Sequence, residues 1–166
     1  KKSKVVAAKK KLKKINSKIK IDCYKIRLSR NNYSKIIKKY DYIIDGSDNF
    51  ETKFLVNDFC KISEKFLVSG AISKFDGHIF TFDFKNKTEP CLKCFYQAEP
   101  SDGILNCEYE GILGPVAGTV GNIQAIEVLK KILNLKKQKN KKILIIDLLN
   151  LEFRKVEFNK KQNCLT

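Results

Sequence analysis

The chain has 166 residues, of which 43% are hydrophobic and 31% charged, and its formal net charge is +16. A chain of this length fits one domain with its own hydrophobic core, and six cysteines are too few for a disulfide-stapled secreted scaffold. The longest uncharged run, 111–126, is shorter than the about 20 apolar residues that span a bilayer, and the charged N-terminus lacks the apolar core of a signal peptide. We therefore expect no membrane association and a cytoplasmic location.

The excess of positive charge comes almost entirely from lysine, because the arginines are Arg27, Arg30 and Arg154. Proteins that read nucleic acids favour arginine for its bidentate contacts with bases and phosphates. Lys, Asn, Ile and Phe, which are abundant here, are the residues that an AT-rich genome over-supplies. A dedicated nucleic-acid binder is therefore the less favoured interpretation. The sequence also contains no methionine and begins within a lysine-rich pattern, so we expect a fragment that is incomplete at its N-terminus.

Hydrophobic periodicity predicts helices and strands in alternation over residues 1–72. Apolar residues at helical spacing predict helices, whereas alternating or continuous apolar residues predict strands. The predicted helices are 1–16, 33–40 and 50–65, and the predicted strands are 18–26, 40–49 and 66–72. This order indicates an α/β fold with a mostly parallel sheet and right-handed crossovers.

The second half of the chain predicts antiparallel strands and one long helix. Segment 76–84 alternates polar and apolar residues and is expected to belong to a second, antiparallel sheet. A helix is predicted over 115–135, and segment 141–158 predicts two strands around a tight turn. The side chains expected to face the core from the helix are Val120, Ile123, Leu129 and Ile132.

Asp45 and Asp48 follow a predicted strand at its carboxyl end. Ligands of open α/β sheets bind at this end of the strands, and a carboxylate there can hold Mg²⁺ on a triphosphate. A structural alternative stays open, because Asp48 or Asn49 could simply cap the helix that begins at residue 50. Spacing alone favours the cap.

Cys91 and Cys94 form a C-x-x-C in a segment that begins with Pro90. Two cysteines at this spacing supply half of a tetrahedral zinc site, and Cys164 is the expected third ligand. A cysteine just past Thr166 would complete a second C-x-x-C. A redox pair and an unrelated surface pair are the alternatives, but redox pairs usually lie at a helix N-terminus, whereas this pair is expected in a loop.

The other sulfur and imidazole groups have less specific surroundings. Cys107 lies in the polar segment "LNCEYEG", where we expect an exposed thiol that is either a nucleophile or without a role. Cys23 and Cys60 lie on apolar faces and are expected to be buried as small hydrophobic residues. His78 falls within an alternating strand, which favours a structural role.

Several stretches, taken in chain order, resemble the sulfur-carrier adenylyltransferases of the MoeB/ThiF group, which are related to ubiquitin-activating enzymes. They are "DGSDNFETKFLVNDFC", "LVSGAISKFDGHIFTF", "PCLKC" and "GILGPVAGTVGNIQAIEVLK". The resemblance covers essentially the whole chain. It implies that residues 1–166 are the C-terminal two-thirds of one Rossmann-like adenylation domain, whose parallel sheet continues into antiparallel strands. The domain would include a zinc-binding loop around 90–95 and a C-terminal tail, 159–166.

The resemblance implies nucleotide-binding roles for three residues. Lys4 corresponds to a lysine that contacts the nucleotide phosphates, Asp48 to the catalytic aspartate that binds magnesium, and Asn49 to its nucleotide-contacting neighbour. Lys53 departs from the family, because many relatives carry arginine there.

For the cysteines, the resemblance implies two separate functions. Cys91, Cys94 and Cys164 correspond to three of four structural zinc ligands. Cys107 corresponds to a catalytic cysteine that, in some members, links covalently to the activated C-terminus of the carrier.

Members of this group use ATP and Mg²⁺ to adenylate the C-terminal glycine of a small ubiquitin-like carrier of the MoaD/ThiS type. They release pyrophosphate, act as homodimers and serve molybdopterin or thiamine-thiazole synthesis. The resemblance implies the same activity, with ATP, Mg²⁺ and Zn²⁺ as cofactors. The family's glycine-rich nucleotide loop is not in this sequence, so a non-catalytic zinc-bearing module that docks a carrier is the second hypothesis.

Overall fold

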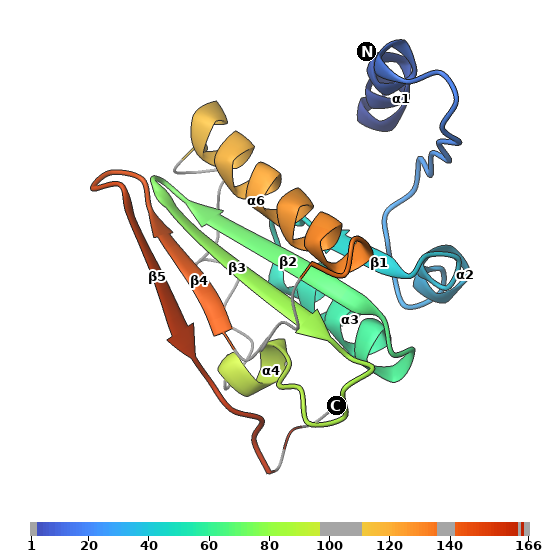
Figure 1. Ribbon diagram of the computed structural model, residues 1–166. Helices are drawn as coiled ribbons and strands as arrows, with labels where there is room; N and C mark the ends of the chain where they lie inside the picture. The colour runs from blue at the N-terminus through green and yellow to red at the C-terminus, as the bar shows by residue number, and fades with distance from the viewer. Residues whose placement is uncertain (1–2, 97–110, 136–141, 163, 165–166) are drawn as a thin grey trace.

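A five-stranded sheet forms the centre of the structure, a computed structural model that describes residues 3–96, 111–135, 142–162 and 164. The strands lie in the sheet in chain order, as Figure 1 shows. They are β1 (Tyr42–Asp45), β2 (Phe66–Ser73), β3 (Asp76–Asp83), β4 (Lys142–Asp147) and β5 (Glu152–Glu157). β1 and β2 are parallel, and every later pair is antiparallel. The expected α/β fold, in which parallel strands continue into antiparallel ones, is confirmed, although the described sheet has a single parallel pair.

The connections between the strands explain this pattern. Helix α3 (Phe50–Ile62) forms the crossover that two parallel strands require, and it joins β1 to β2. β2 then turns directly into β3 through Lys74 and Phe75, and Lys74 has a positive φ of 50°. The expectation of a second sheet for segment 76–84 is wrong, because so short a turn forces this strand to pair with β2 in the same sheet.

Helices cover both faces of the sheet (Figure 1). Helix α6 (Gly114–Ile132) lies on one face, where Val120 and Val128 pack with Phe66 and Val68 of β2. On the other face, α3 and the short helix α4 (Leu92–Phe95) pack in a cluster that includes Leu67. Successive residues of β2 therefore belong to opposite cores, as the alternation of side chains along a strand requires.

The buried stripe of α6 differs in part from the predicted one. Val120 is buried and Ile123 packs against the core, but the predictions for Leu129 and Ile132 are wrong, because these side chains are 53% and 51% exposed. The buried positions, spaced four residues apart, are Val116, Val120, Gln124 and Val128. A prediction that selects only hydrophobic residues omits Gln124. The predicted buried stripe is therefore rotated around the helix axis relative to the observed one.

The N-terminal segment forms fewer contacts than the sequence suggests. Helix α1 (Lys4–Ile15) forms as predicted but buries none of its residues, and it lies apart from the sheet in Figure 1. Helix α2 (Tyr33–Ile37) buries Ile37. The strand expected over 18–26 does not form, because a strand needs a hydrogen-bonded neighbour and no described strand pairs with this segment. Cys23 is half-buried rather than buried, and its thiol donates to the Val5 carbonyl at 3.3 Å.

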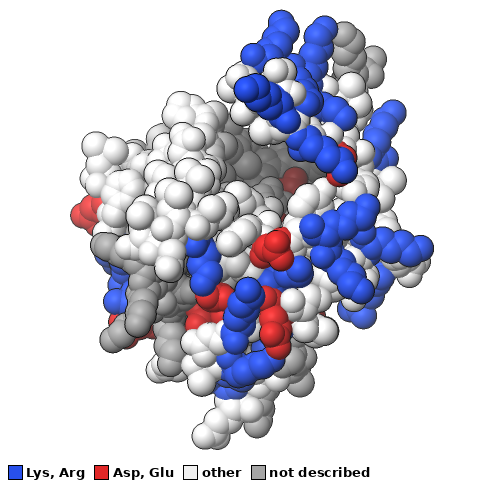
Figure 2. Space-filling model, turned by 45° about the vertical axis from the view of Figure 1, so that its right-hand side comes forward, with Lys and Arg blue, Asp and Glu red and all other residues white. Residues whose placement is uncertain are grey.

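Basic side chains gather over α1 and the segments that follow it, as Figure 2 shows. The exposed lysines of this part include Lys9, Lys10, Lys11, Lys14, Lys18, Lys20, Lys25, Lys35 and Lys38.

Among the described residues, no helix is both long enough and apolar enough to cross a membrane.

Candidate nucleotide and metal sites

A pocket of about 210 Å³ opens at the carboxyl end of β1. Its walls come from the loop after β1, from β2 and from the N-terminal half of α6, and they include Ser47, Asp48, Ala71, Ala117 and Gly121. The carboxyl end of a parallel strand is where open α/β sheets bind their ligands. The volume is below the about 300 Å³ at the lower end of small-molecule sites, so the pocket suits a part of a nucleotide rather than the whole.

Asp48 is exposed and lines this pocket. Its Oδ1 accepts a hydrogen bond from Asn49 Nδ2 at 3.2 Å. A solvent-facing carboxylate offers the hard oxygen ligand that Mg²⁺ takes, together with water and phosphate oxygens. The chemistry of Asp48 therefore fits a magnesium ion.

Asn49 has the capping role that the spacing favoured. Its Oδ1 accepts a hydrogen bond from the Thr52 N–H at 2.8 Å, so Asn49 is the N-cap of α3. The amide nitrogen of the same side chain points to Asp48. Asn49 therefore links the start of the helix to the candidate magnesium ligand.

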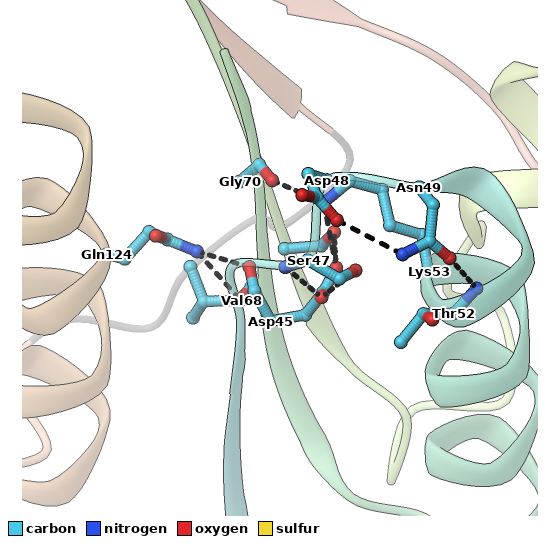
Figure 3. A network of polar contacts seen from close by, with 10 residues as sticks. Asp45, Ser47, Asp48, Asn49, Thr52, Lys53, Val68, Gly70 and Gln124 are labelled. Carbon is cyan, nitrogen blue, oxygen red and sulfur yellow. Dashed lines mark hydrogen bonds and ion pairs between the residues drawn. The ribbon is translucent and has the colours of Figure 1, made fainter. Parts of the chain in front are cut away.

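A buried polar network holds the loop that carries Asp48 (Figure 3). Oδ2 of Asp45 lies 3.1 Å from Lys53 Nζ and accepts a hydrogen bond from Ser69 Oγ at 2.6 Å. Oδ1 of Asp45 accepts hydrogen bonds from the N–H and the hydroxyl of Ser47 at 2.9 and 2.6 Å. Lys53 also donates to the Gly70 carbonyl. Both charges of the pair are thus compensated, and the first turn of the loop is fixed.

Gln124 of α6 reaches the end of β1 and the first half of β2 from the other face of the sheet. Its Nε2 donates to the Asp45 carbonyl at 2.9 Å and to the Val68 carbonyl at 3.1 Å. A Cβ at Gly70 would lie 2.8 Å from the Gln124 amide, so a larger residue there would push this amide away from its two acceptors. Gln124 was not predicted from the sequence, although one polar side chain within an apolar helical stripe is a signal for such a contact.

Three cysteine sulfurs lie together on the α3 side of the sheet. The Sγ atoms of Cys91 and Cys94 are 3.8 Å apart, and Cys164 Sγ lies 3.4 and 3.5 Å from them. A tetrahedral zinc ion with Zn–S bonds of about 2.3 Å places its sulfurs about 3.8 Å apart. The separations of the three sulfurs are close to this value, so their geometry fits such an ion.

The start of α4 positions two of these cysteines. Cys91 is the residue before the helix and Cys94 lies within it, so the expectation of a plain loop is wrong. The fully buried Asn57 accepts a hydrogen bond from the Leu92 N–H at 3.0 Å and fastens this turn to α3. The position of the pair at a helix start is therefore compatible with a redox role. The third sulfur nevertheless favours a metal site, because a redox dithiol needs only two cysteines.

An aromatic cluster brings the end of the chain back toward α4. The ring of Phe158, after β5, lies 5.5 Å from Phe95 and 6.2 Å from Phe80. Cys164 packs against the same core. Its proximity to the C-x-x-C is therefore a consequence of tertiary packing that brings residues about seventy positions apart into contact.

Lys4, Cys60 and His78 belong neither to the pocket lining nor to the cysteine cluster. Lys4 is exposed at the start of α1 and is not among the residues that line the pocket. Cys107 lies outside the described residues. Cys60 is fully buried as predicted, and burial raises the pKa of its thiol to about 12. His78 is half-buried in β3, where burial lowers its pKa below the ordinary 6.5.

Fold and site together define a Rossmann-like α/β domain with a ligand pocket at the carboxyl end of its parallel strands. The model of the ThiF family matches residues 1–166, and the chain belongs to this family. The resemblance found in the sequence is thereby confirmed.

Two curated relatives are about one-third identical to the chain over the aligned residues. "Adenylyltransferase and sulfurtransferase MOCS3" of Dictyostelium discoideum is 36% identical over 163 residues, which is 97% of this chain and 38% of that protein. "Sulfur carrier protein adenylyltransferase" of Thermus thermophilus is 33% identical over 165 residues, 97% of this chain and 61% of the relative. The chain thus spans between about a third and two thirds of the length of these relatives.

Solved structures of E. coli MccB share the fold. The structure of MccB with ATP superposes with a TM-score of 0.79 and 17% identity, over 99% of this chain and 51% of MccB. The structure of MccB with SeMet MccA gives a TM-score of 0.76 and 16% identity, over 98% and 50%. At this level of identity, the likeness supports the architecture alone.

Proposed function

We propose that the protein containing this chain uses ATP to adenylate the C-terminal glycine of a small ubiquitin-like sulfur carrier. The observation that carries the proposal is Asp48, an exposed carboxylate that lines the pocket at the carboxyl end of β1. Membership in the ThiF family and the names of both relatives support adenylation of a sulfur carrier.

In the proposed reaction, a carboxylate oxygen of the carrier's terminal glycine attacks the α-phosphorus of ATP. The bond from this phosphorus to the oxygen of the β-phosphate breaks, and pyrophosphate leaves. Asp48 would hold a Mg²⁺ ion, which would supply positive charge for the phosphates. Asn49 contacts the nucleotide from beside Asp48, and Lys4 offsets phosphate charge. Because the pocket takes only part of a nucleotide, the phosphates would have to extend beyond it to reach Lys4.

The test of this function is ATP–pyrophosphate exchange by the full-length protein with MoaD-type and ThiS-type carriers. Asp48→Ala should lower exchange by roughly 100-fold or more. Asp41→Ala is the matched control, since Asp41 is exposed just before the other end of β1, and it should leave exchange unchanged. Carrier binding without any exchange by the parent protein would instead favour the non-catalytic docking module.

We also propose that Cys91, Cys94 and Cys164 hold a structural zinc ion, which would tie the end of the chain to α4. The separations of the three sulfurs support this assignment. One equivalent of zinc in the purified full-length protein, lost in Cys91→Ser and retained in Cys23→Ser, is the expected result. Less than one equivalent that Cys91→Ser does not change would contradict it.

Cys107 is proposed as a covalent handle for the carrier, on the strength of the family resemblance. Its thiolate would attack the carbonyl carbon of the acyl adenylate, so that a C–S bond forms, the C–O bond to AMP breaks, and AMP leaves. Intact-mass spectrometry after ATP addition should then detect a protein–carrier adduct that Cys107→Ser abolishes. An unchanged rate of sulfur transfer by this variant in the whole pathway would exclude the role.

Pathway, assembly and compartment are proposed with the reaction. The carrier would serve molybdopterin or thiamine-thiazole synthesis, and the full-length protein would be a homodimer, which sedimentation velocity would test. A cytoplasmic location agrees with the cysteine content, since six cysteines in 166 residues are too few for a disulfide-stapled secreted scaffold. A nucleic-acid role for the lysine-rich surface would instead require a steep dependence of DNA affinity on salt.

A further inference from the structure

A lysine of α3 reaches the cysteine cluster. Lys61 lies in the last turn of the helix, and its Nζ is 3.4 Å from Cys164 Sγ and 3.8 Å from Cys91 Sγ. The side chain is half-buried. At these distances an ammonium group donates hydrogen bonds to sulfur, and the two acceptors are 73 positions apart in the chain.

The charge of the cluster gives this contact a chemical meaning. Metal-bound cysteines are thiolates, and three of them outweigh the two positive charges of a zinc ion. Cys91 and Cys94 are 0% and 5% exposed, so the excess negative charge would be poorly solvated. A buried charge is costly unless a partner of opposite sign and hydrogen bonds compensate it. The ammonium of Lys61 is in position to supply both.

The neighbouring lysine is engaged elsewhere. Lys93 lies between the two cysteines of the motif, but its Nζ pairs with Asp58 at 2.6 Å. The cation at the sulfurs is therefore provided by α3, thirty residues before Cys91, and not by the motif itself. Lys93 offers a matched control, because the two lysines differ in whether they contact sulfur.

We propose that Lys61 is a positioning residue of the metal site. It donates hydrogen bonds to the metal-bound thiolates of Cys91 and Cys164, offsets their excess charge, and thereby strengthens zinc binding without being a ligand. This inference rests on the proposed zinc site.

The experiment measures zinc affinity of the full-length protein by competition with a chromophoric chelator. Lys61→Met, which keeps the length of the side chain and its helix propensity, should weaken zinc binding by roughly 10- to 100-fold. Lys61→Arg restores a cationic donor and should bind within a few-fold of the parent. Lys93→Met should leave the affinity unchanged. Circular dichroism of each zinc-loaded variant establishes that it is folded.

Cobalt substitution separates a donor from a ligand. The thiolate-to-cobalt absorption of Lys61→Met, measured at saturating Co²⁺, should keep the parent intensity, because the number of coordinated sulfurs does not change.

Three results would overturn the inference. They are a zinc affinity of Lys61→Met equal to that of the parent, an equal loss in Lys61→Arg, and a loss of thiolate absorption in Lys61→Met. If the parent protein itself binds no zinc, the proposed zinc site fails and this inference falls with it. The zinc content of the parent therefore distinguishes the two failures.

Discussion

The ammonium of Lys53 lies 3.1 Å from the carboxylate of Asp45, and each of the two side chains is only 3% exposed. The pair stands where β1 ends and is completed by hydrogen bonds from Ser47 and Ser69. A buried ion pair of this kind contributes little net stability, but the loss of one partner leaves an uncompensated charge. Its effect here is to fix the backbone that presents Asp48 to the pocket.

Removal of one member of this pair should be strongly destabilising. Lys53→Met leaves Asp45 buried without its counter-charge and should lower the free energy of unfolding by about 3–5 kcal/mol, measured by urea denaturation. Lys93→Met removes the partly exposed pair with Asp58 and should cost about 1 kcal/mol or less. Similar losses in both variants would show that burial of the Asp45 pair has no special weight.

Gly70 tests the approach of α6 to the strand ends. In Gly70→Ala the new methyl group would meet the Gln124 amide and displace it from the carbonyls of Asp45 and Val68, at a cost of about 1–3 kcal/mol. Gly118 lies in α6 with open space around its Cα, so Gly118→Ala should stabilise the protein by about 0.5–1 kcal/mol. Thermal unfolding of both variants checks the opposite signs. A neutral Gly70→Ala would mean that Gln124 moves aside freely.

His78, the one histidine of the chain, should make stability depend on pH. Its folded-state pKa lies below 6.5, so between that pKa and 6.5 the unfolded chain binds a proton that the folded chain lacks. Stability should therefore fall as the pH drops through 6.5 and should not depend on His78 at higher pH. Urea denaturation at pH 7.5 and 5.5 should show a larger loss in the parent than in His78→Gln. Equal losses would remove His78 as the cause.

Substitutions can separate the two roles of Asn49, as the N-cap of α3 and as a proposed nucleotide contact. Asn49→Ala removes the acceptor for the Thr52 N–H and should cost about 1 kcal/mol of stability, whereas Asn49→Asp keeps a good cap. If the amide of Asn49 also contacts the nucleotide, Asn49→Asp should retain stability but lose ATP–pyrophosphate exchange. Full exchange by Asn49→Asp would leave the residue with the cap alone.

Local patterns were sufficient for most of the helices and strands. α3 and β2 were predicted because most of their apolar residues are buried. β1 was predicted from its apolar run, although Tyr42 and Ile44 are exposed. Segment 18–26 failed because alternation defines two faces but does not provide a paired strand. β3 was assigned to the wrong sheet, because nothing in the sequence identifies Lys74 and Phe75 as a two-residue turn that joins it to β2.

For the site, motifs named Asp48 and the clustered cysteines, but they also named Lys4, which does not line the pocket. Asp48 lines the pocket, and the sulfurs of Cys91 and Cys164 meet. Lys53 and Lys61 look in the sequence like two more lysines on an amphipathic helix. Their partners come from other strands and from the end of the chain, so only tertiary packing identifies them.

The agreement between strand order and chain order has a consequence for the folding pathway. The hairpins β2–β3 and β4–β5 close short loops, and β1 joins β2 through one helix, so these units can form early. The pairing of Phe80 with Ile143 instead closes the long connection that contains both the C-x-x-C and α6. We expect this docking to be the slow step, and Cys164, beyond β5, reaches its partners only afterwards. A metal ion would then stabilise the contacts that form last. It would slow unfolding without changing the rate of the earlier folding steps.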